Sequence, residues 1–402
     1  MMNSPAPQQA GAPAGAASSL RSWLAVISIA VGSFGLVTTE FLPIGLLTDI
    51  SRSLGISDGE AGLMVTTPGI AAAIAAPILT VGSGRLDRRF VLWGLTGLLV
   101  LSNLLVALAP NLPVILIGRV MLGIGVGGFW TFAPSLGTRL VAATSAGRAT
   151  AIILAGISAG TVCGVPAGAL IGQLMSWRAA FGITSGFAVL VLIAQILLLP
   201  PLRTAHAIRF GHLVALLGIP KARIGLIASG LIILGHFAAY TYLRPFLEQG
   251  PRLGPSVITV VLLAYGIAGF FGNFLGEAGV ARSVRVALIV TACVLGGSLL
   301  LAPVFGGGKI AAISIVTAWG FAFGAVPICM QTWMFKAAPD VIEGGSALFI
   351  TVVQVALAAG SLVGGLTVDH LGISSVLILG GVMSVATAVI VWGFGHDRVV
   401  VA

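Results

Sequence analysis

Residues 24–47 read LAVISIAVGSFGLVTTEFLPIGLL, and this stretch decides the fold class. About 20 apolar residues in a helix span the roughly 30 Å of hydrocarbon in a bilayer, and here the single charged side chain is that of Glu40. A carboxylate in hydrocarbon costs several kcal/mol unless it takes up a proton, meets a partner or faces a water-filled cavity. The stretch therefore predicts a transmembrane helix, with Glu40 as the first candidate functional residue.

The composition of the whole chain extends this interpretation. Apolar residues make up 58% of the 402 positions and charged residues 8%, and the mean hydropathy is +1.12. Soluble proteins carry roughly 25% charged residues, so the chain is expected to be a polytopic membrane protein that contacts the lipid bilayer. Residues 1–21 lack the basic start and apolar core of a signal peptide and are expected to form a disordered cytoplasmic tail.

Twelve stretches are long and apolar enough to cross a membrane, which predicts an all-α protein with twelve transmembrane helices. With the N-terminus in the cytoplasm, fourteen Lys and Arg residues fall on the cytoplasmic side and four on the opposite side. This bias follows the positive-inside rule and predicts that both termini are cytoplasmic. The expected spans are 23–47, 61–82, 91–109, 114–136, 148–173, 179–199, 224–247, 256–276, 286–305, 310–334, 344–367 and 374–395.

The long segment 200–223 divides the spans into two sets of six, 22–199 and 224–396, followed by a cytoplasmic tail at 397–402. A weak internal match supports a duplication, because TTEFLP aligns with TYLRPF so that Glu40 corresponds to Tyr242 and Pro43 to Pro245. The alternative is two unrelated helix ends that both contain proline. Two pseudo-symmetric halves would place a substrate site near the midplane between them.

Two arginines fall within expected spans, Arg119 and Arg244. At ~1.5 Å per residue, Glu40 and Arg119 are expected at the same depth, roughly 8 to 10 Å below the outer surface. Glu40 and Arg119 could form a proton-sensitive latch, since protonation of the carboxylate would release the arginine. Arg244 competes as the partner, and a static pair is the alternative. His236 could join the proton path or could hydrogen-bond to a neighbouring helix.

A glycine recurs at every fourth position of the fifth span, which predicts a face that another helix approaches closely. That face could be a plain packing ridge or a sliding surface during transport. The glycines are Gly156, Gly160, Gly164, Gly168 and Gly172, with Pro166 between them.

Three motifs resemble those of the major facilitator superfamily, and specifically of its twelve-span drug:proton antiporter group. They are GRLDRR at residues 84–89, RVMLGIGVG at 119–127 and GISAGTVCGVPAGALIG at 156–172. The resemblance implies a cytoplasmic gate at Asp87 and Arg88, a proton-transfer role for Arg119 and gating roles for Gly164 and Pro166. It departs from the usual pattern at Ser83, Leu122 and Val165. Two six-helix halves need no second chain, so a monomer is expected.

The segments GRVMLGIGVGGFW, TYLRPFLE and EGGSALFITVVQVALAAGSLVGG are most similar to bacterial exporters of purine ribonucleosides. TTEFLPIGLLTDI is also similar to the sugar efflux transporters. The resemblance implies proton-coupled export of small polar molecules, such as inosine, across the bacterial inner membrane by alternating access. Sugar or multidrug efflux remains an alternative, as does a non-transporting membrane receptor.

Aromatic and polar residues of the fourth, seventh and tenth spans are expected to bind the substrate. Aromatic faces stack on planar bases and polar groups recognise their edges, although ordinary packing is the alternative for each residue. The candidates are Phe129, Trp130, Tyr240, Tyr242, Arg244, Trp319 and Gln331.

The sequence offers little support for an enzyme. It contains no phosphate-binding loop, HExxH or G-x-S-x-G motif. The three cysteines are scattered and no two histidines have a metal-ligand spacing, so neither a cofactor nor a metal is expected. The net charge of +9 does not form one patch, which argues against nucleic acid as a partner.

Overall fold

The computed structural model describes residues 19–83, 86–202, 218–337 and 342–394. Gly84 and Arg85 of the loop motif lie outside the described residues, as do most of the expected linker 200–223, most of the expected N-terminal tail and all of the expected tail 397–402. Within the described part, twelve helices are long and apolar enough to cross a membrane, as the sequence predicts.

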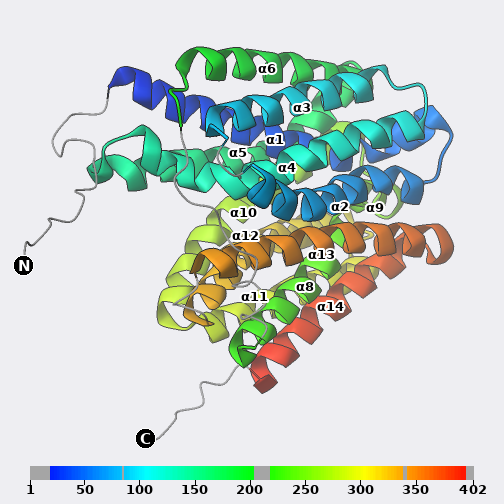
Figure 1. The fold of residues 1–402 in the computed structure, drawn as a ribbon. Coiled ribbons are helices and arrows are strands. Elements are labelled where there is room, and N and C mark those ends of the chain that lie inside the picture. The colour runs from blue at the N-terminus through cyan, green and yellow to red at the C-terminus, as the bar shows by residue number, and fades with distance from the viewer. Residues whose placement is uncertain (1–18, 84–85, 203–217, 338–341, 395–402) are drawn as a thin grey trace, which may run out of the picture.

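The helices form two groups, shown as two bodies of ribbon in Figure 1. The first group contains α1 Leu20–Leu54, α2 Asp58–Gly82, α3 Arg88–Leu108, α4 Leu112–Leu140, a 3₁₀ turn Ala143–Ser145, α5 Ala146–Leu174 and α6 Trp177–Leu198. The second group contains α8 Pro220–Tyr240, α9 Leu243–Gln249, α10 Pro255–Arg282, α11 Val284–Phe305, α12 Lys309–Ala337, α13 Ile342–Leu371 and α14 Ile373–Phe394.

The seventh expected span, 224–247, is two helices rather than one. Helix α8 ends at Tyr240 and α9 begins at Leu243. Pro245 has no N–H to donate to the carbonyl of Thr241, so an unbroken helix would lose a hydrogen bond there. In the observed arrangement Pro245 lies in the first turn of α9, where a helix leaves its N–H groups unbonded anyway.

The glycines of α5 pack against α1, as the periodicity predicts. A side chain at Gly156 would meet the carbonyl oxygen of Ala30, and one at Gly164 would lie 2.9 Å from the Cα of Thr38. Because both contacts are within the first group, the glycine face of α5 joins two helices of one group. The second group repeats this arrangement between α13 and α8, where Gly360 meets Leu234.

The two groups contact each other in one half of the molecule, which extends from the middle of the bundle to the end where residues 55–57 connect α1 to α2. We call this the joined end, and the opposite end, where α1 begins and α14 ends, the terminal end. The hydrophobic core of the second group continues into the first group through residues of α1, α2 and α5 near the joined end. Those residues are Ile44, Leu47, Ala61, Val65, Val165 and Ala169.

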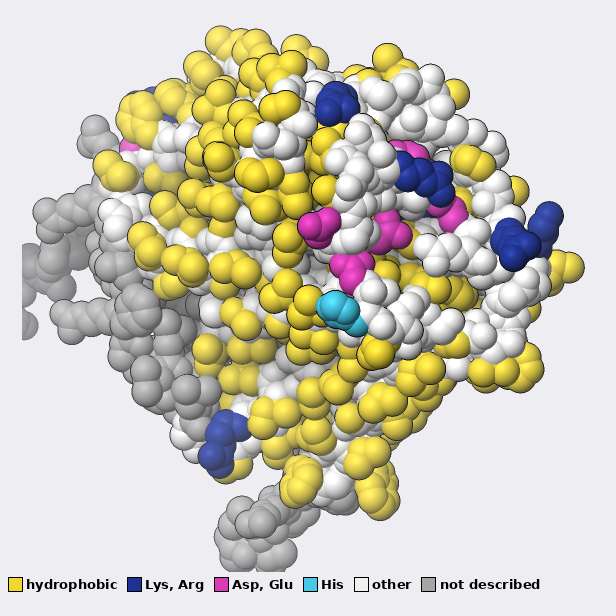
Figure 2. Space-filling view, turned by 90° about the vertical axis from the view of Figure 1, so that its right-hand side faces the viewer, with side chains coloured by type: hydrophobic (Ala, Val, Ile, Leu, Met, Phe, Trp, Pro, Cys, Tyr) yellow, Lys and Arg dark blue, Asp and Glu magenta, His cyan; other side chains and the backbone are white. Residues whose placement is uncertain are grey.

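Figure 2 views the molecule from the right-hand side of Figure 1, which is the joined end. Acidic and basic side chains gather on this face and are bordered by apolar side chains. Five acidic residues belong to this end of the helices, namely Asp49, Asp58, Glu60, Glu248 and Asp369. Three of them, Asp49, Glu248 and Asp369, accept hydrogen bonds from residues of the other helix group.

Candidate functional site

Glu40 is buried at the boundary between the two helix groups. Glu40 is 3% exposed, and it is the buried one among the acidic residues for which the structure describes the burial of the side chain. Its Oε1 accepts a hydrogen bond of 3.5 Å from the Nε2 of Gln354 on α13, in the other group. Beside it, the ring of Phe41 stacks on that of Phe237 on α8, with centroids 5.7 Å apart. A change of charge on Glu40 would therefore directly alter the contacts between the two helix groups.

Arg119 of α4 is fully buried and lies at the level of Glu40, as the sequence predicts. Its guanidinium donates to three backbone carbonyls: Nε to Met64 at 2.6 Å, Nη1 to Thr39 at 2.9 Å and Nη2 to Glu40 at 2.8 Å. No ion pair joins Arg119 to the Glu40 carboxylate among the salt bridges of the described residues. The direct latch expected between these two side chains is therefore absent from this conformation.

Prolines explain two of these carbonyl bonds. In a helix the carbonyl of residue i accepts from the N–H of residue i+4, and proline has no N–H. Pro43 of α1 therefore leaves the Thr39 carbonyl without its usual donor, and Pro68 of α2 does the same to Met64. Arg119 supplies a donor to both carbonyls and so links two proline-containing helices.

Arg244, the other candidate partner of Glu40, lies at the joined end instead. It donates to both carboxylate oxygens of Asp49 on α1, at 2.8 and 2.9 Å, and to the Gly45 carbonyl. Its Nε donates to Glu248, which also accepts from Arg52 at 3.2 Å. These four charged residues, Asp49, Arg52, Arg244 and Glu248, form what we call the joined-end ion-pair cluster. It connects α1 to α9 across the boundary.

A second connection at the joined end involves Asp369, near the end of α13. Its carboxylate accepts from the Ser57 hydroxyl at 2.7 Å and from the Gly59 backbone N–H at 3.1 Å. Gly59 lies in the first turn of α2, where backbone N–H groups have no partner within the helix and where the helix dipole favours negative charge. An acidic residue of one group thus binds the N-terminus of a helix of the other.

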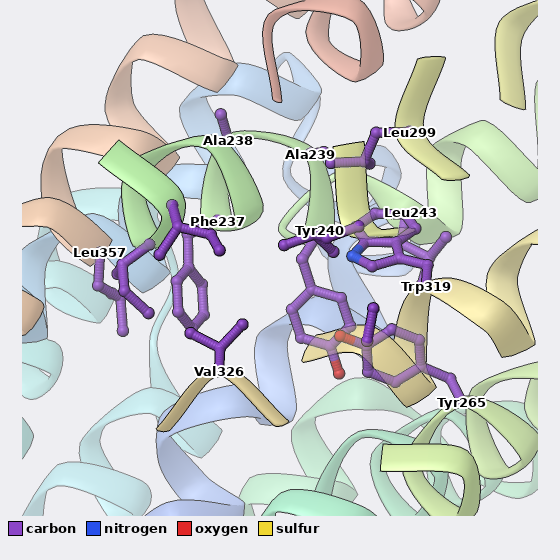
Figure 3. Close-up of a cluster of buried hydrophobic side chains, with 14 of the residues drawn as sticks. Phe237, Ala238, Ala239, Tyr240, Leu243, Tyr265, Leu299, Trp319, Val326 and Leu357 are labelled. Carbon is purple, nitrogen blue, oxygen red and sulfur yellow. The ribbon is translucent and has the colours of Figure 1, made fainter. Parts of the chain in front are cut away.

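Four rings of the second group are stacked in one row, which we call the ring ladder: Phe323, His236, Tyr240 and Tyr265. The centroid distances along the row are 3.4, 5.0 and 4.8 Å, and neighbouring planes differ by 4°, 24° and 22°. Trp319 lies edge-on to the last three rings. Figure 3 shows Tyr240, Tyr265 and Trp319 grouped on one side of this core.

Polar atoms within the ring ladder are incompletely bonded. The Nε1 of Trp319 donates to the Nδ1 of His236 at 3.1 Å. The other imidazole nitrogen, Nε2, is buried with no hydrogen-bond partner in the described structure, and the same holds for the hydroxyl of Tyr265. Among the ladder rings, Phe323 is partly exposed and the other three are buried.

The structure does not bring all the expected substrate residues together. Tyr240 and Trp319 belong to the ring-ladder region, but Phe129 is buried in the core of the first group and Trp130 packs against that core. The Tyr242 hydroxyl donates to the Ser361 carbonyl at 2.9 Å, on the joined-end side of the bundle. On α12, Gln331 is exposed.

The expected cytoplasmic gate residues bond within the first group. Asp87 caps the start of α3, accepting from the Arg89 N–H at 3.0 Å, and accepts from the Leu202 N–H at 2.9 Å. Arg88 donates to Ser83 and lies over the ring of Phe132 with its guanidinium carbon 4.4 Å from the centroid. These bonds fasten the α2–α3 connection to the segment that follows α6.

Sequence reasoning missed Gln354, Asp49, Glu248 and Asp369. Gln354 is a polar residue within an apolar run, and this signal could have singled it out. The three acidic residues stand near helix ends, where charged residues are ordinary, so only their partners in space mark them. Within the described part of the chain, no group of three His, Cys, Asp or Glu side chains could hold a metal ion.

Comparisons with known proteins agree with this arrangement. The sequence matches the model of the Major Facilitator Superfamily over residues 29–356. The purine ribonucleoside efflux pump NepI of Escherichia coli (strain K12) is 35% identical over 370 residues, covering 92% of this chain and 93% of the pump. The pump of the same name from Shigella flexneri matches equally well.

Two solved structures share the fold. A bacterial homologue of the human lysosomal transporter Spinster, in an inward-facing and occupied conformation, has a TM-score of 0.73 at 16% identity and covers 92% of this chain and 95% of its own. The D-xylose–proton symporter has a TM-score of 0.72 at 18% identity, with coverages of 93% and 97%.

Proposed function

The chain belongs to the major facilitator superfamily, and from this membership we propose that it is a proton-coupled antiporter that exports purine ribonucleosides, such as inosine, across the bacterial inner membrane. It is a multi-pass bacterial membrane protein and a transporter rather than an enzyme. The relatives named as purine ribonucleoside efflux pumps support the substrate class. In this proposal both termini are cytoplasmic, the joined end faces the medium and the monomer is the working unit.

The observation that carries the proton coupling is the burial of Glu40 where the two helix groups meet. A carboxylate is far more costly than a neutral carboxylic acid in an apolar boundary. A proton from the medium would neutralise Glu40, and the empty carrier could then close the side that faces the medium. Release of that proton to the cytoplasm would then restore the charge as a nucleoside binds.

Arg119 supports this step by holding the backbone that carries Glu40. Its bonds to the carbonyls of Thr39 and Glu40 fix the turn of α1 from which the carboxylate projects. Arg119 keeps these bonds whether or not Glu40 is charged, because the acceptors are backbone oxygens. Its role in coupling is therefore to position Glu40 and to supply positive charge nearby.

Alternating access requires the joined end to separate. The Arg244 bonds to Asp49 and the Asp369 bonds to α2 cross the boundary and must break, while the Arg244 bond to Glu248 lies within α9 and can persist. Arg244 thus keeps one carboxylate partner in both conformations. At the terminal end, Asp87 and Arg88 would close the cytoplasmic side, with Gly164 and Pro166 of α5 accommodating the movement against α1.

On the substrate side, the best-supported residues are Tyr240 and Trp319, which belong to the ring-ladder region. We assign His236 to this region rather than to the proton path, since its neighbours are Trp319 and aromatic rings. Gln331 stays a candidate because it is exposed. We do not place Phe129, Trp130, Tyr242 and Arg244 at the substrate site, since the first two belong to the first-group core and the others bond towards the joined end.

The test is uptake of labelled inosine, arabinose and a cationic dye into inverted membrane vesicles with an acidic interior. We expect inosine to accumulate, with a burst of proton release from the vesicles, and vesicles without the protein to show neither. Accumulation of arabinose or dye in place of inosine would support sugar or multidrug efflux. Binding of a ligand without any flux would indicate a receptor and would refute the proposal.

A further inference from the structure

Trp319 fixes the tautomer of His236. An indole N–H can only donate, so the Nδ1 of His236 that receives its hydrogen bond must carry a lone pair. In the neutral imidazole the remaining proton is then on Nε2. The side chain therefore presents one N–H donor of known position within the core of the second group.

That donor has no acceptor. His236 is fully buried, and its Nε2 has no hydrogen-bond partner among the described residues. Buried polar groups in native proteins are nearly always bonded, and an exception needs a reason, such as a partner that arrives from outside. The Tyr265 hydroxyl, at the other end of the ring ladder, is a second buried atom without a partner. The ring ladder therefore contains two polar groups that form no hydrogen bond within the described part of the protein.

We infer that the Nε2–H of His236 donates to N7 of the purine base and thereby selects purine over pyrimidine ribonucleosides. The inference rests on the proposed function. Both adenine and 6-oxopurine bases have N7 as an acceptor, whereas the group at position 6 is a donor in one and an acceptor in the other. A single N–H aimed at N7 therefore recognises every purine ribonucleoside, whereas a pyrimidine lacks N7 and can offer only acceptors in different positions, such as a carbonyl oxygen.

Phe323 covers one face of the His236 imidazole. Its ring lies directly over the imidazole, with centroids 3.4 Å apart and planes 4° from parallel, and it is the partly exposed ring of the ladder. Aromatic pairs prefer offset or edge-to-face arrangements to such full overlap, so rotation of Phe323 gives up little at the imidazole, although it also breaks the edge-to-face contact with Phe237. Rotation of Phe323 would uncover His236, and because the Nε2–H lies in the plane of the imidazole, a base that accepts from it must meet this ring at its edge rather than in the place of Phe323.

Trp319 is a positioning residue in this scheme. Its contact with the substrate is not required, because its indole N–H acts through His236. Without that bond, either imidazole nitrogen can carry the proton and the ring can turn, so part of the population would present an acceptor to N7 instead of a donor.

The first experiment compares inosine with 7-deazainosine, which has a C–H in place of N7, and with uridine, using the purified native protein in proteoliposomes. Loss of one buried hydrogen bond corresponds to about a tenfold change in affinity. We expect the KM for 7-deazainosine to be about tenfold higher than that for inosine at similar kcat, with uridine transported poorly. Equal KM values for inosine and 7-deazainosine would overturn the inference even if His236 variants failed to fold.

The second experiment uses His236→Phe, which keeps a flat ring and removes the donor. We expect this variant to transport inosine and 7-deazainosine with the same, raised KM. Trp319→Phe should lower the ratio of the two KM values to about threefold, because only the orientation of the donor is lost. His370→Phe, at an exposed histidine at the end of α13, is the matched control and should keep the native ratio.

The two proposals can fail separately. If the native protein exports inosine but ignores the change at N7, and His236→Phe keeps the native ratio, the assignment of His236 is wrong and the export function stands. If the native protein moves no nucleoside at all, the proposed function is wrong, and the inference falls with it.

Discussion

At the scale of single residues, Arg119 donates hydrogen bonds to two backbone carbonyls that prolines leave without a donor in their own helices. Its donors reach the carbonyls of Thr39 and Met64, four residues before Pro43 and Pro68. We predict that Arg119→Leu destabilises the protein by about 2 to 6 kcal/mol, because two buried carbonyls lose their donors at ~1–3 kcal/mol each. Thermal unfolding of the purified protein in detergent measures the loss.

Restoring the backbone donors should rescue this variant. In the Arg119→Leu background, Pro43→Ala and Pro68→Ala return the N–H groups that bond Thr39 and Met64 in an ordinary helix. We expect the triple variant to recover a clear part of the lost stability. If the proline substitutions lower stability equally with and without Arg119, the arginine does not serve these carbonyls.

Glu40→Gln keeps the shape of the side chain and removes its charge. We predict that it abolishes inosine uptake driven by a pH gradient in inverted vesicles while the protein stays folded, since an amide at this position can neither take up nor release a proton. The matched control is Glu277→Gln, at an exposed carboxylate on α10. Gradient-driven uptake in Glu40→Gln at the native rate would exclude Glu40 from coupling.

The sequence predicted correctly at which level along their helices two charged residues lie, because that level depends only on their position within the spans. Charge in an apolar run singled out Glu40 and Arg119 and placed them at one level, which the hydrogen bond to the Glu40 carbonyl confirms. The sequence could not give the acceptors, because the direction of a guanidinium depends on which carbonyls the neighbouring helices offer. Arg244 shows the same limit, since its partners Asp49 and Glu248 become neighbours only after folding.

At the scale of helices, α5 offers a controlled test of close packing. Gly156→Ala would push a methyl group against the backbone of Ala30 on α1. We expect a loss of about 1–3 kcal/mol, since inserting a methyl group into a tight contact forces the backbone apart. Gly147→Ala on the same helix meets nothing within 4 Å and should be neutral or slightly stabilising. Thermal unfolding of the two variants, side by side, checks the difference.

The helix pattern shows what periodicity can and cannot reveal. Apolar length correctly predicted twelve crossing helices, and the fourfold glycine spacing correctly predicted a close helix contact. The break between α8 and α9 was missed because the run 224–247 is long and apolar enough for one span, with Arg244 its single charged residue. Pro245 was the available signal, but a proline near one end of a span is compatible with a kink as well as with a break.

At the scale of the whole molecule, the contacts between α2 and α13 should separate and re-form in each transport cycle. A side chain at Gly69 would have its Cβ 3.0 Å from that of Ala358, close to disulfide geometry after a small adjustment. With the native cysteines replaced, we predict that oxidation of Gly69→Cys/Ala358→Cys stops inosine transport and that a reductant restores it.

The control pair joins two helices within the second group. Gly276→Cys/Ala325→Cys has an equally close geometry between α10 and α12, with the Cβ of Ala325 2.8 Å away. Since neither helix needs to leave the other, oxidation there should leave transport near its native rate. Undiminished transport by the oxidised α2–α13 pair would contradict movement at the joined end.

The joined end also makes the carrier responsive to its surroundings. Arg52 is 73% exposed and its bond to Glu248 is open to solvent, whereas Arg244 is 7% exposed. The Debye length is about 8 Å at 0.15 M ionic strength and about 3 Å at 1 M, so mobile ions weaken an exposed pair with 3.2 Å between its atoms mainly at high salt, and a sheltered pair far less. With this face towards the medium, a saline environment should weaken the outermost bond and favour opening, whereas dilute water should hold the carrier shut. In the proposed orientation, the rate of nucleoside export would then vary with the ionic strength of the medium.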